Sequence, residues 1–191
     1  QGWWPVKEKY HPRNYSFPNN KKQEFEIIVG AILTQNTSWK NVEKSIEDLR
    51  RNDLLSAKSI INSSQEKLTS VIRGSGYYNQ KARKLKEFSK FYLKEKNVSL
   101  VNQKVLRQKL LSIWGIGEET ADSILLYAYK KPFFVVDTYT KRLFKKILNL
   151  DFSKYKQWQE FFHNALPLDY KLFNEFHALI VAEGKSQRLP K

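Results

Sequence analysis

Apolar side chains recur at spacings of three and four residues along nearly the whole chain. This spacing places them on one face of an α-helix. The first four such stretches lie at Phe25, Ile28, Val29 and Ile32; Val42, Ile46 and Leu49; Leu68, Val71 and Ile72; and Ala82, Leu85, Phe88 and Tyr92. Further helices are expected at about 104–112, 119–130, 138–148, 154–165 and 170–183. The pattern predicts an all-α protein.

Two segments depart from the helical pattern. Residues 133–136 are four consecutive apolar side chains, which favour a buried connection over a strand. Residues 1–22 hold three prolines and several aromatic side chains without a period. They predict an irregular arm that must pack on another part of the protein to be ordered.

The charge balance favours a polyanionic partner. The 191 residues include 34 Lys and Arg against 19 Asp and Glu, which gives a formal net charge of +15. Such a field attracts nucleic acid and makes binding salt-dependent. The charge alone is also compatible with a basic protein that has no special partner. A hydrophobic fraction of 41% is sufficient for a core in one large or two small domains.

Several features are missing from the sequence. No apolar run approaches the roughly 20 residues that cross a membrane, and no signal peptide is visible. We therefore expect a cytoplasmic, nucleoid-associated protein with no membrane partner, although the chain begins at Gln1 and can be a fragment. Without cysteine there is no disulfide and no thiolate metal site. The three histidines, His11, His163 and His177, have no metal-ligand spacing, so no metal is expected.

A glycine turn and an aspartate are the candidate functional groups of the sequence. Gly115-Ile116-Gly117 precedes a predicted helix, where successive backbone N–H groups can bind a phosphate, with Lys141 as a further phosphate contact. Asp137 follows apolar residues and precedes a helix, so it is predicted to be an N-cap whose ionised form is favoured.

Four motifs in order resemble one family. They are Leu-Thr-Gln-Asn-Thr at 33–37, Gly-Tyr-Tyr-Asn-Gln-Lys-Ala at 76–82, the hairpin at 115–117 and Val-Asp-Thr at 136–138. Over about residues 23–184 the chain resembles the endonuclease III superfamily of DNA glycosylases, the helix-hairpin-helix group. The motifs Gly-Trp-Trp-Pro at 2–5 and Thr-Ser-Trp at 37–39 are most similar to its 3-methyladenine DNA glycosylase branch.

The resemblance implies a two-lobed fold with the active site in the cleft between the lobes. One lobe would be a six-helix domain at 16–131 that carries the helix-hairpin-helix at about 108–130. Residues 1–15 and 132–191 would form a second helical domain from both chain ends. The expected partner is double-stranded DNA with a damaged base, bound by a monomer.

The resemblance also implies roles for two carboxylates. Asp137 would be catalytic, acting on the sugar and on water, although most aspartates at such a place are only caps. Glu119 stands where superfamily members that cut the strand have a lysine. A carboxylate cannot form their Schiff base, which predicts hydrolysis without efficient strand cleavage. Glu119 as a simple first-turn acid stays open, as does weak lyase activity from another lysine.

The remaining site residues also follow from the resemblance. The base pocket is predicted at Trp3, Trp4, Trp39 and Lys185, where aromatic rings would attract a cationic alkylated purine. Gln35 and Tyr77 are predicted to insert into the duplex. Trp114 and Trp158 are assigned to packing, and His177 is interpreted as a packed or capping residue.

The sequence leaves the cofactor and the substrate partly open. Without cysteines the chain as given cannot hold the iron–sulfur cluster that many relatives bind, and a cluster supplied by a longer native chain stays open. A monovalent cation at the hairpin is compatible with the sequence. The predicted activity is release of alkylated purines such as 3-methyladenine. The alternatives are a glycosylase for uracil, mismatched thymine or oxidised bases, and a non-catalytic DNA-binding module.

Overall fold

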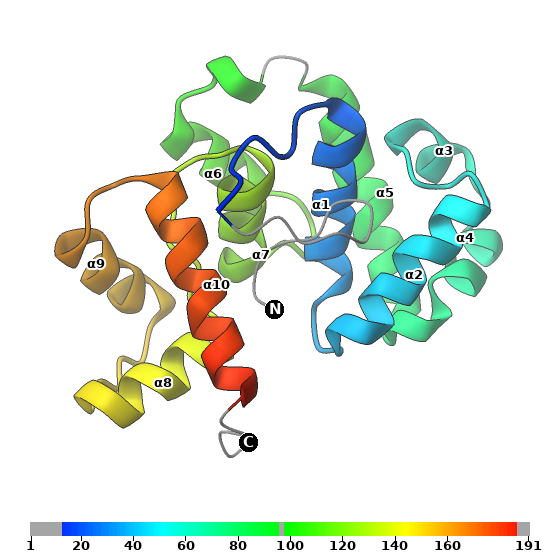
Figure 1. Ribbon diagram of the computed structural model, residues 1–191. Coiled ribbons are helices and arrows are strands. Elements are labelled where there is room, and N and C mark those ends of the chain that lie inside the picture. The colour runs from blue at the N-terminus through cyan, green and yellow to red at the C-terminus, as the bar shows by residue number, and fades with distance from the viewer. Residues whose placement is uncertain (1–12, 96–97, 187–191) are drawn as a thin grey trace.

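The computed structural model describes residues 13–95 and 98–186, and the all-α prediction is confirmed there (Figure 1). The first half of the chain forms α1 (Lys21–Leu33), α2 (Trp39–Arg51), α3 (Ala57–Asn62), α4 (Gln65–Val71), the 3₁₀ turn η1 (Arg73–Ser75) and α5 (Tyr78–Lys94). The second half forms η2 (Val98–Leu100), α6 (Gln103–Leu111), α7 (Glu118–Ser123), η3 (Ile124–Ala128), α8 (Thr138–Leu148), α9 (Tyr155–Ala165) and α10 (Tyr170–Ser186).

Helix α1 is the central helix of the first lobe. It begins after Asn20, whose side chain accepts a hydrogen bond from the Gln23 N–H, and most of its residues from Phe25 onward are buried. Helices α2, α5 and α7 and the turn η3 all pack against it. Figure 1 shows α2 to α5 gathered on one side of α1, and α8 to α10 on the other.

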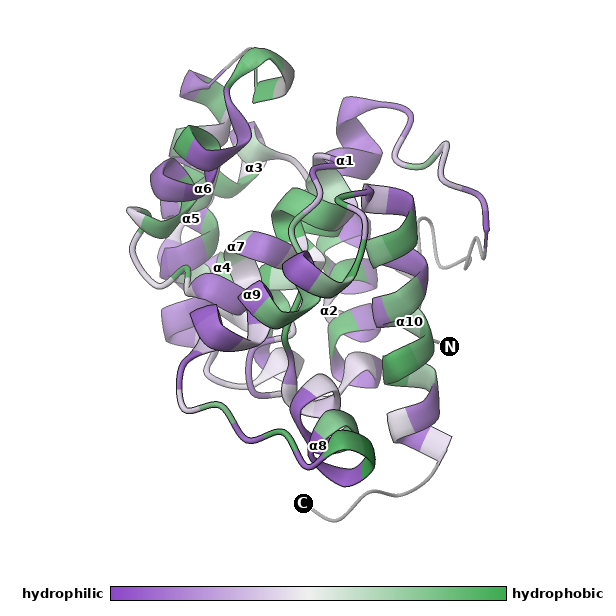
Figure 2. Ribbon diagram, turned by 90° about the vertical axis from the view of Figure 1, so that its left-hand side faces the viewer, coloured by the Kyte–Doolittle hydropathy of each residue, from purple (hydrophilic) through white to green (hydrophobic). Residues whose placement is uncertain are grey.

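The second lobe is built around aromatic rings and a close helix pair. Phe134 stacks on Phe162 with ring centroids 3.9 Å apart. Helix α10 packs on α8 at Gly184, where a Cβ atom would lie 2.5 Å from the Tyr139 ring. Figure 2 shows α8 and α10 with alternating hydrophobic and hydrophilic segments, as expected for helices with one buried face.

Helix α7 ends in a wider turn than the sequence pattern predicts. The predicted helix at 119–130 continues from α7 into η3, a π-helical turn in which the Tyr129 N–H donates to the Ile124 carbonyl at 3.1 Å. Lys130 then takes a left-handed backbone conformation with φ 53°. The extra residue in this turn changes the direction of every side chain that follows it.

A buried carboxylate joins the two lobes. Asp122 of α7 is fully buried and accepts two hydrogen bonds from the Arg107 guanidinium of α6, at 2.7 and 2.9 Å. Gln159 of α9 donates a third hydrogen bond to it at 2.8 Å. The contact fixes α9 against α6 and α7.

Residues 133–136 form the predicted buried connection. Three α9 side chains spaced by four residues hold its backbone. Gln159 donates to the Phe134 carbonyl at 2.9 Å, and the Phe134 N–H donates to His163 Nε2 at 3.0 Å. The Val136 N–H donates to the Tyr155 hydroxyl at 3.2 Å. This segment ends directly before Asp137, so its fixed backbone positions that residue.

The described part of the N-terminal arm packs as expected. The Tyr15 hydroxyl donates to Glu175 of α10 at 2.9 Å, and Lys130 donates to the Ser16 carbonyl at 3.0 Å. The domain limits at 15/16 and 131/132 stay a prediction. No helix of residues 13–95 and 98–186 is long and apolar enough to span a membrane.

The His163 contact makes stability depend on pH. Burial, together with the charge of Arg107, lowers the pKa of His163 below its ordinary 6.5. The unfolded chain therefore takes up a proton first as pH falls, so stability present above pH 6.5 is lost as pH falls through the folded pKa. We predict that His163→Gln, whose amide oxygen accepts the same bond without titrating, reduces this loss. Urea unfolding at about pH 7.5 and about pH 5 measures it, and equal losses in both proteins would contradict the prediction.

Candidate active site at the hairpin and Asp137

Asp137 is the N-cap of α8, as predicted. Its Oδ1 accepts a hydrogen bond from the Thr140 N–H at 2.8 Å and another from the Thr140 hydroxyl at 2.9 Å. Its Oδ2 lies 3.5 Å from Nε2 of His177, and 16% of the side chain is exposed. The cap therefore fixes one carboxylate oxygen, while the other faces α10.

Asp137 is held in its ionised form. Burial by itself would raise the pKa of this carboxyl group, but the contacts from His177 and Thr140 lower it, and the lowering dominates. The pKa of Asp137 lies below its ordinary 3.8. At neutral pH the group is a carboxylate.

Glu119 lies near enough to Asp137 for their charges to interact. It is in the first turn of α7, and part of its side chain is exposed. The carboxyl group is nevertheless crowded by protein, and burial raises its pKa, with a second rise from the charge of Asp137. His177 and Lys141 oppose that rise. The structure thus brings three predicted residues and one histidine into a single electrostatic cluster.

The predicted phosphate turn connects α6 and α7. Gly115 has φ +79°, a conformation that favours glycine, and Gly117 is the N-cap residue of α7. The Ile116 N–H donates to the Ile113 carbonyl at 3.1 Å, and the Ile116 side chain is buried. The amide of Ile116 is therefore engaged inside the turn, and its phosphate role stays a prediction.

Gln35 lies against this hairpin. Its amide nitrogen donates to the Thr120 hydroxyl at 2.8 Å and to the Gly115 carbonyl at 3.3 Å, and its oxygen accepts from Lys84. Entering a duplex would require these hydrogen bonds to break. Its insertion role stays a prediction, and the structure shows it in a hairpin-bound conformation.

Tyr77 is presented to solvent from a constrained turn. Its side chain is 64% exposed, although its backbone is left-handed with φ 46°. Such a conformation is unusual for a tyrosine and persists only where neighbouring contacts fix it. The buried Lys81 ammonium does so by donating to the Ser75 carbonyl at 2.6 Å. Burial, with the charge of Lys84, lowers the pKa of Lys81 to about 8.

The tryptophans have different environments. Trp158 is 1% exposed, so its packing assignment is confirmed, whereas that of Trp114 is wrong: Trp114 is 43% exposed, and the Arg83 guanidinium lies 3.9 Å above its ring. Trp39 is half-buried and donates to Glu43 at 2.7 Å. Trp3 and Trp4 lie outside the described residues. Lys185 is exposed in the last turn of α10.

The chain matches a known family of DNA repair proteins. A family model described as HhH-GPD superfamily base excision DNA repair protein matches residues 29–167. The chain belongs to this superfamily.

Individual relatives support the assignment. A proposed DNA repair glycosylase of Methanocaldococcus jannaschii is 44% identical over 97% of this chain and 80% of its own length. The solved structure of H. pylori 3-methyladenine DNA glycosylase, bound to 1,N6-ethenoadenine, has a TM-score of 0.74 at 34% identity. That match covers 94% of this chain and 91% of the other. Endonuclease III of Thermotoga maritima is 29% identical over 80% of this chain and 71% of its own.

Two site residues of this HhH-GPD protein escaped the sequence analysis. His177 faces Asp137 instead of only packing, and Tyr127, which was not singled out, bonds to His177. Both stand among the apolar residues of helices, where the sequence pattern indicates only core. The one available signal was a lone polar ring on the buried face of α10.

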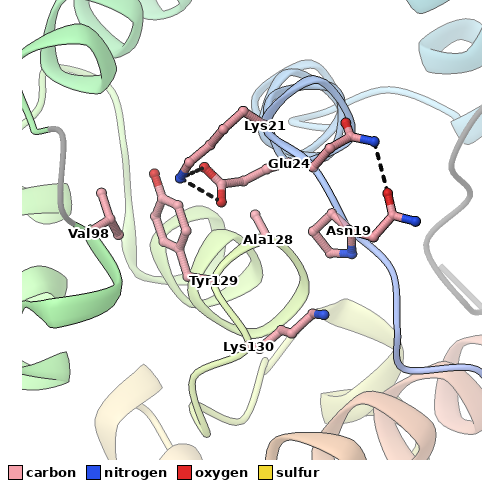
Figure 3. A pocket seen from close by; sticks show the side chains of 9 residues that line it. Asn19, Lys21, Glu24, Val98, Ala128, Tyr129 and Lys130 are labelled. Atoms are coloured by element: carbon pink, nitrogen blue, oxygen red, sulfur yellow. Dashed lines mark hydrogen bonds and ion pairs between the residues drawn. The ribbon is translucent and has the colours of Figure 1, made fainter.

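A separate cavity lies away from the carboxylates. It has a volume of about 390 Å³ and lies between the start of α1 and the end of η3, where Figure 3 shows Lys21 paired with Glu24 across from Tyr129. None of the residues predicted for the active site lines it. Among the described residues, no group of three or more His, Cys, Asp or Glu side chains could hold a metal ion.

Substitutions at the two hairpin glycines are predicted to affect different properties of the protein, stability at one position and DNA binding at the other. Gly115→Ala would place an alanine at positive φ and its Cβ 2.5 Å from Lys84, so we predict a stability loss of about 1–2 kcal/mol. A Cβ at Gly117 meets nothing within 4 Å. Gly117→Ala is therefore predicted to keep the Tm while weakening DNA binding, because the methyl group would stand where a phosphate approaches.

Thermal unfolding and binding to a duplex with an abasic-site analogue measure both effects. Gly117→Ala with unchanged DNA affinity would contradict the phosphate role of this turn. A Gly115→Ala protein as stable as the wild type would contradict the conformational argument.

Proposed function

We propose that this chain is a monofunctional DNA glycosylase that excises alkylated purines such as 3-methyladenine by hydrolysis. The observation that carries the proposal is the pair of carboxylates: Asp137 is ionised at the N-cap of α8, and its charge raises the pKa of Glu119. The family resemblance implies that Glu119 occupies the position of the nucleophilic lysine of strand-cutting members. The chemistry available to such a site is charge stabilisation and activation of water.

The reaction follows from the charge of Asp137. As the bond between sugar C1′ and the base nitrogen breaks, its electron pair leaves with the base and positive charge develops on the sugar. A carboxylate facing the sugar stabilises that charge. Water then forms the new C1′–O bond and gives up a proton, which Asp137 Oδ2 can accept. A cationic base leaves as a neutral molecule and needs no general acid.

Glu119 restricts the chemistry to water. Strand cleavage through a Schiff base needs an amine at the sugar carbon, and a carboxylate cannot form an imine. Lys141 is the amine whose charge reaches Glu119, so it is the first candidate for any residual lyase activity.

The choice of base is proposed from the aromatic residues and the relatives. The similar H. pylori enzyme is a 3-methyladenine DNA glycosylase. Trp39, together with Trp3 and Trp4 and with Lys185 near the pocket, would frame a flipped base, and ring faces attract a cationic purine. A neutral pyrimidine would instead need hydrogen-bond partners along its edge.

The DNA contacts are proposed for one broad surface. The hairpin at 115–117 would bind a phosphate together with Lys141, and Gln35 and Tyr77 would fill the gap left by the flipped base. The Arg83 guanidinium stacked on Trp114 stands beside the hairpin and can donate to a neighbouring phosphate. The enzyme would act as a monomer on nucleoid DNA in the cytoplasm, without an iron–sulfur cluster and with room for a monovalent cation at the hairpin.

Base release from damaged duplexes tests the proposal. We predict rapid release of 3-methyladenine and 7-methylguanine, and little release of uracil, mismatched thymine or 8-oxoguanine. Asp137→Asn should slow release by at least about 100-fold, because a neutral amide cannot stabilise the sugar cation. The matched control is Asp151→Asn, an exposed aspartate just after α8, which should behave as the wild type.

Three results would point elsewhere. Preferred release of uracil would replace the substrate class, and preferred release of 8-oxoguanine would do the same. Binding to the damaged duplexes without release of any base would indicate a non-catalytic DNA-binding module.

Borohydride trapping tests the monofunctional mechanism. We predict no covalent adduct between the protein and abasic DNA, because Glu119 offers no amine. An endonuclease III serves as the positive control. A faint adduct that disappears in Lys141→Gln would assign a weak lyase to that lysine, whereas a strong adduct would overturn the mechanism.

A further inference from the structure

We propose that His177 is a positioning residue for Asp137, and that Tyr127 selects the form of the histidine ring that faces the carboxylate. The inference rests on the proposed function, because Asp137 is assigned there as the catalytic group. It assigns a role to two buried side chains that no motif of the sequence identifies.

The three side chains form a continuous line across the lobes. Tyr127 belongs to η3 and His177 to α10, and both are buried. The Tyr127 hydroxyl lies 2.6 Å from His177 Nδ1, and His177 Nε2 lies 3.5 Å from Asp137 Oδ2. The imidazole ring therefore stands between a phenol and the carboxylate, with one nitrogen toward each.

The phenol decides where the ring carries its protons. Burial, with the charges of Asp137 and Glu175, raises the pKa of Tyr127, so its hydroxyl stays protonated at neutral pH. When this hydroxyl donates to Nδ1, a neutral ring must carry its hydrogen on Nε2. A protonated ring also carries a hydrogen there. In both cases an N–H group points toward Asp137.

The disfavoured form is the neutral ring with its hydrogen on Nδ1. It would place the lone pair of Nε2 against the carboxylate oxygen and would repel the ionised form. Among the described residues, His177 Nε2 has no hydrogen-bond partner within ordinary geometry, so Asp137 Oδ2 is the acceptor that it faces. The contact is electrostatic at this distance. It favours the charge on Oδ2 without occupying that oxygen as fully as Thr140 occupies Oδ1.

Other ionisable groups also surround Asp137. The charges of Glu119 of α7 and Asp137 oppose each other, and Lys141 of α8 lowers the pKa of Glu119. Tyr155 of α9 faces Glu119, and Glu175 of α10 faces Tyr127. Lys141 is exposed to solvent, where its charge is screened. The buried histidine is thus the group best placed to keep Asp137 ionised beside a second carboxyl group.

The test is the pH profile of single-turnover release of 3-methyladenine, corrected for spontaneous depurination. The wild-type rate should be flat from about pH 8 to about pH 5, because Asp137 stays ionised. His177→Leu leaves burial and Glu119 uncompensated, so the pKa of Asp137 rises and a new acid limb should appear within this pH range. At about pH 5 its rate should lie roughly 10-fold below its own plateau.

Two conservative variants make the test specific. His177→Gln keeps an N–H donor at the same side of the residue and should remove most of the acid limb. Tyr127→Phe keeps the shape of the ring and loses only the hydroxyl, so it should show an intermediate limb because the histidine can then adopt either form. Thermal unfolding and binding to an abasic-site duplex establish that each variant folds.

The outcomes separate this inference from the proposed function. A His177→Leu protein that is slower by the same factor at every pH would reduce His177 to a packing residue. The inference would also be overturned if His177→Gln showed an acid limb in its pH profile as large as that of His177→Leu. An unchanged, flat profile in Tyr127→Phe would overturn it as well. If the wild type released no base from any duplex, the proposed function would fail. Titration of the Asp137 carboxyl carbon by NMR would then still show whether its pKa rises in His177→Leu.

Discussion

The buried Asp122 carboxylate is the contact on which the arrangement of the two lobes depends. A charge removed from water is tolerated only when donors surround it, and here Arg107 and Gln159 supply three hydrogen bonds from two other helices. The same Gln159 side chain also binds the backbone of the connecting segment. The position of Asp137 is therefore set by one polar cluster that also holds α9, so the geometry of the proposed catalytic group depends on the same contacts as the packing of the two lobes.

The pKa values of the two carboxyl groups of the site differ because of their environments more than because one is an aspartate and the other a glutamate. Asp137 has hydrogen-bond donors on one oxygen and a histidine near the other, whereas Glu119 has a neighbouring negative charge and few compensating contacts. One pKa is lowered and the other raised. Paired carboxyl groups with divergent pKa values are typical of sites where one group must stay charged while its neighbour changes its protonation state.

Local features of this protein could be predicted from the sequence, and contacts between distant segments could not. The helices follow from apolar spacing, and the cap at Asp137 follows from its neighbours, because both depend on residues within one or two turns. The line from Tyr127 to His177 spans 50 residues, so no local pattern contains it. The packing predicted for Trp114 is wrong because an apolar residue beside a turn has the same sequence pattern whether its side chain is buried or lies under an arginine.

The π-helical turn at Ile124–Ala128 contains one residue more than a regular turn. In an α-helix each residue advances the side-chain direction by about 100°. A helix of this kind shortened by that one residue would rotate everything beyond the deletion by about the same angle, and Tyr127 would no longer be directed at His177. The number of residues in this turn thus determines the direction in which the Tyr127 side chain points. A relative can keep every polar residue of this line and still lose its alignment through the deletion of one apolar residue in this turn.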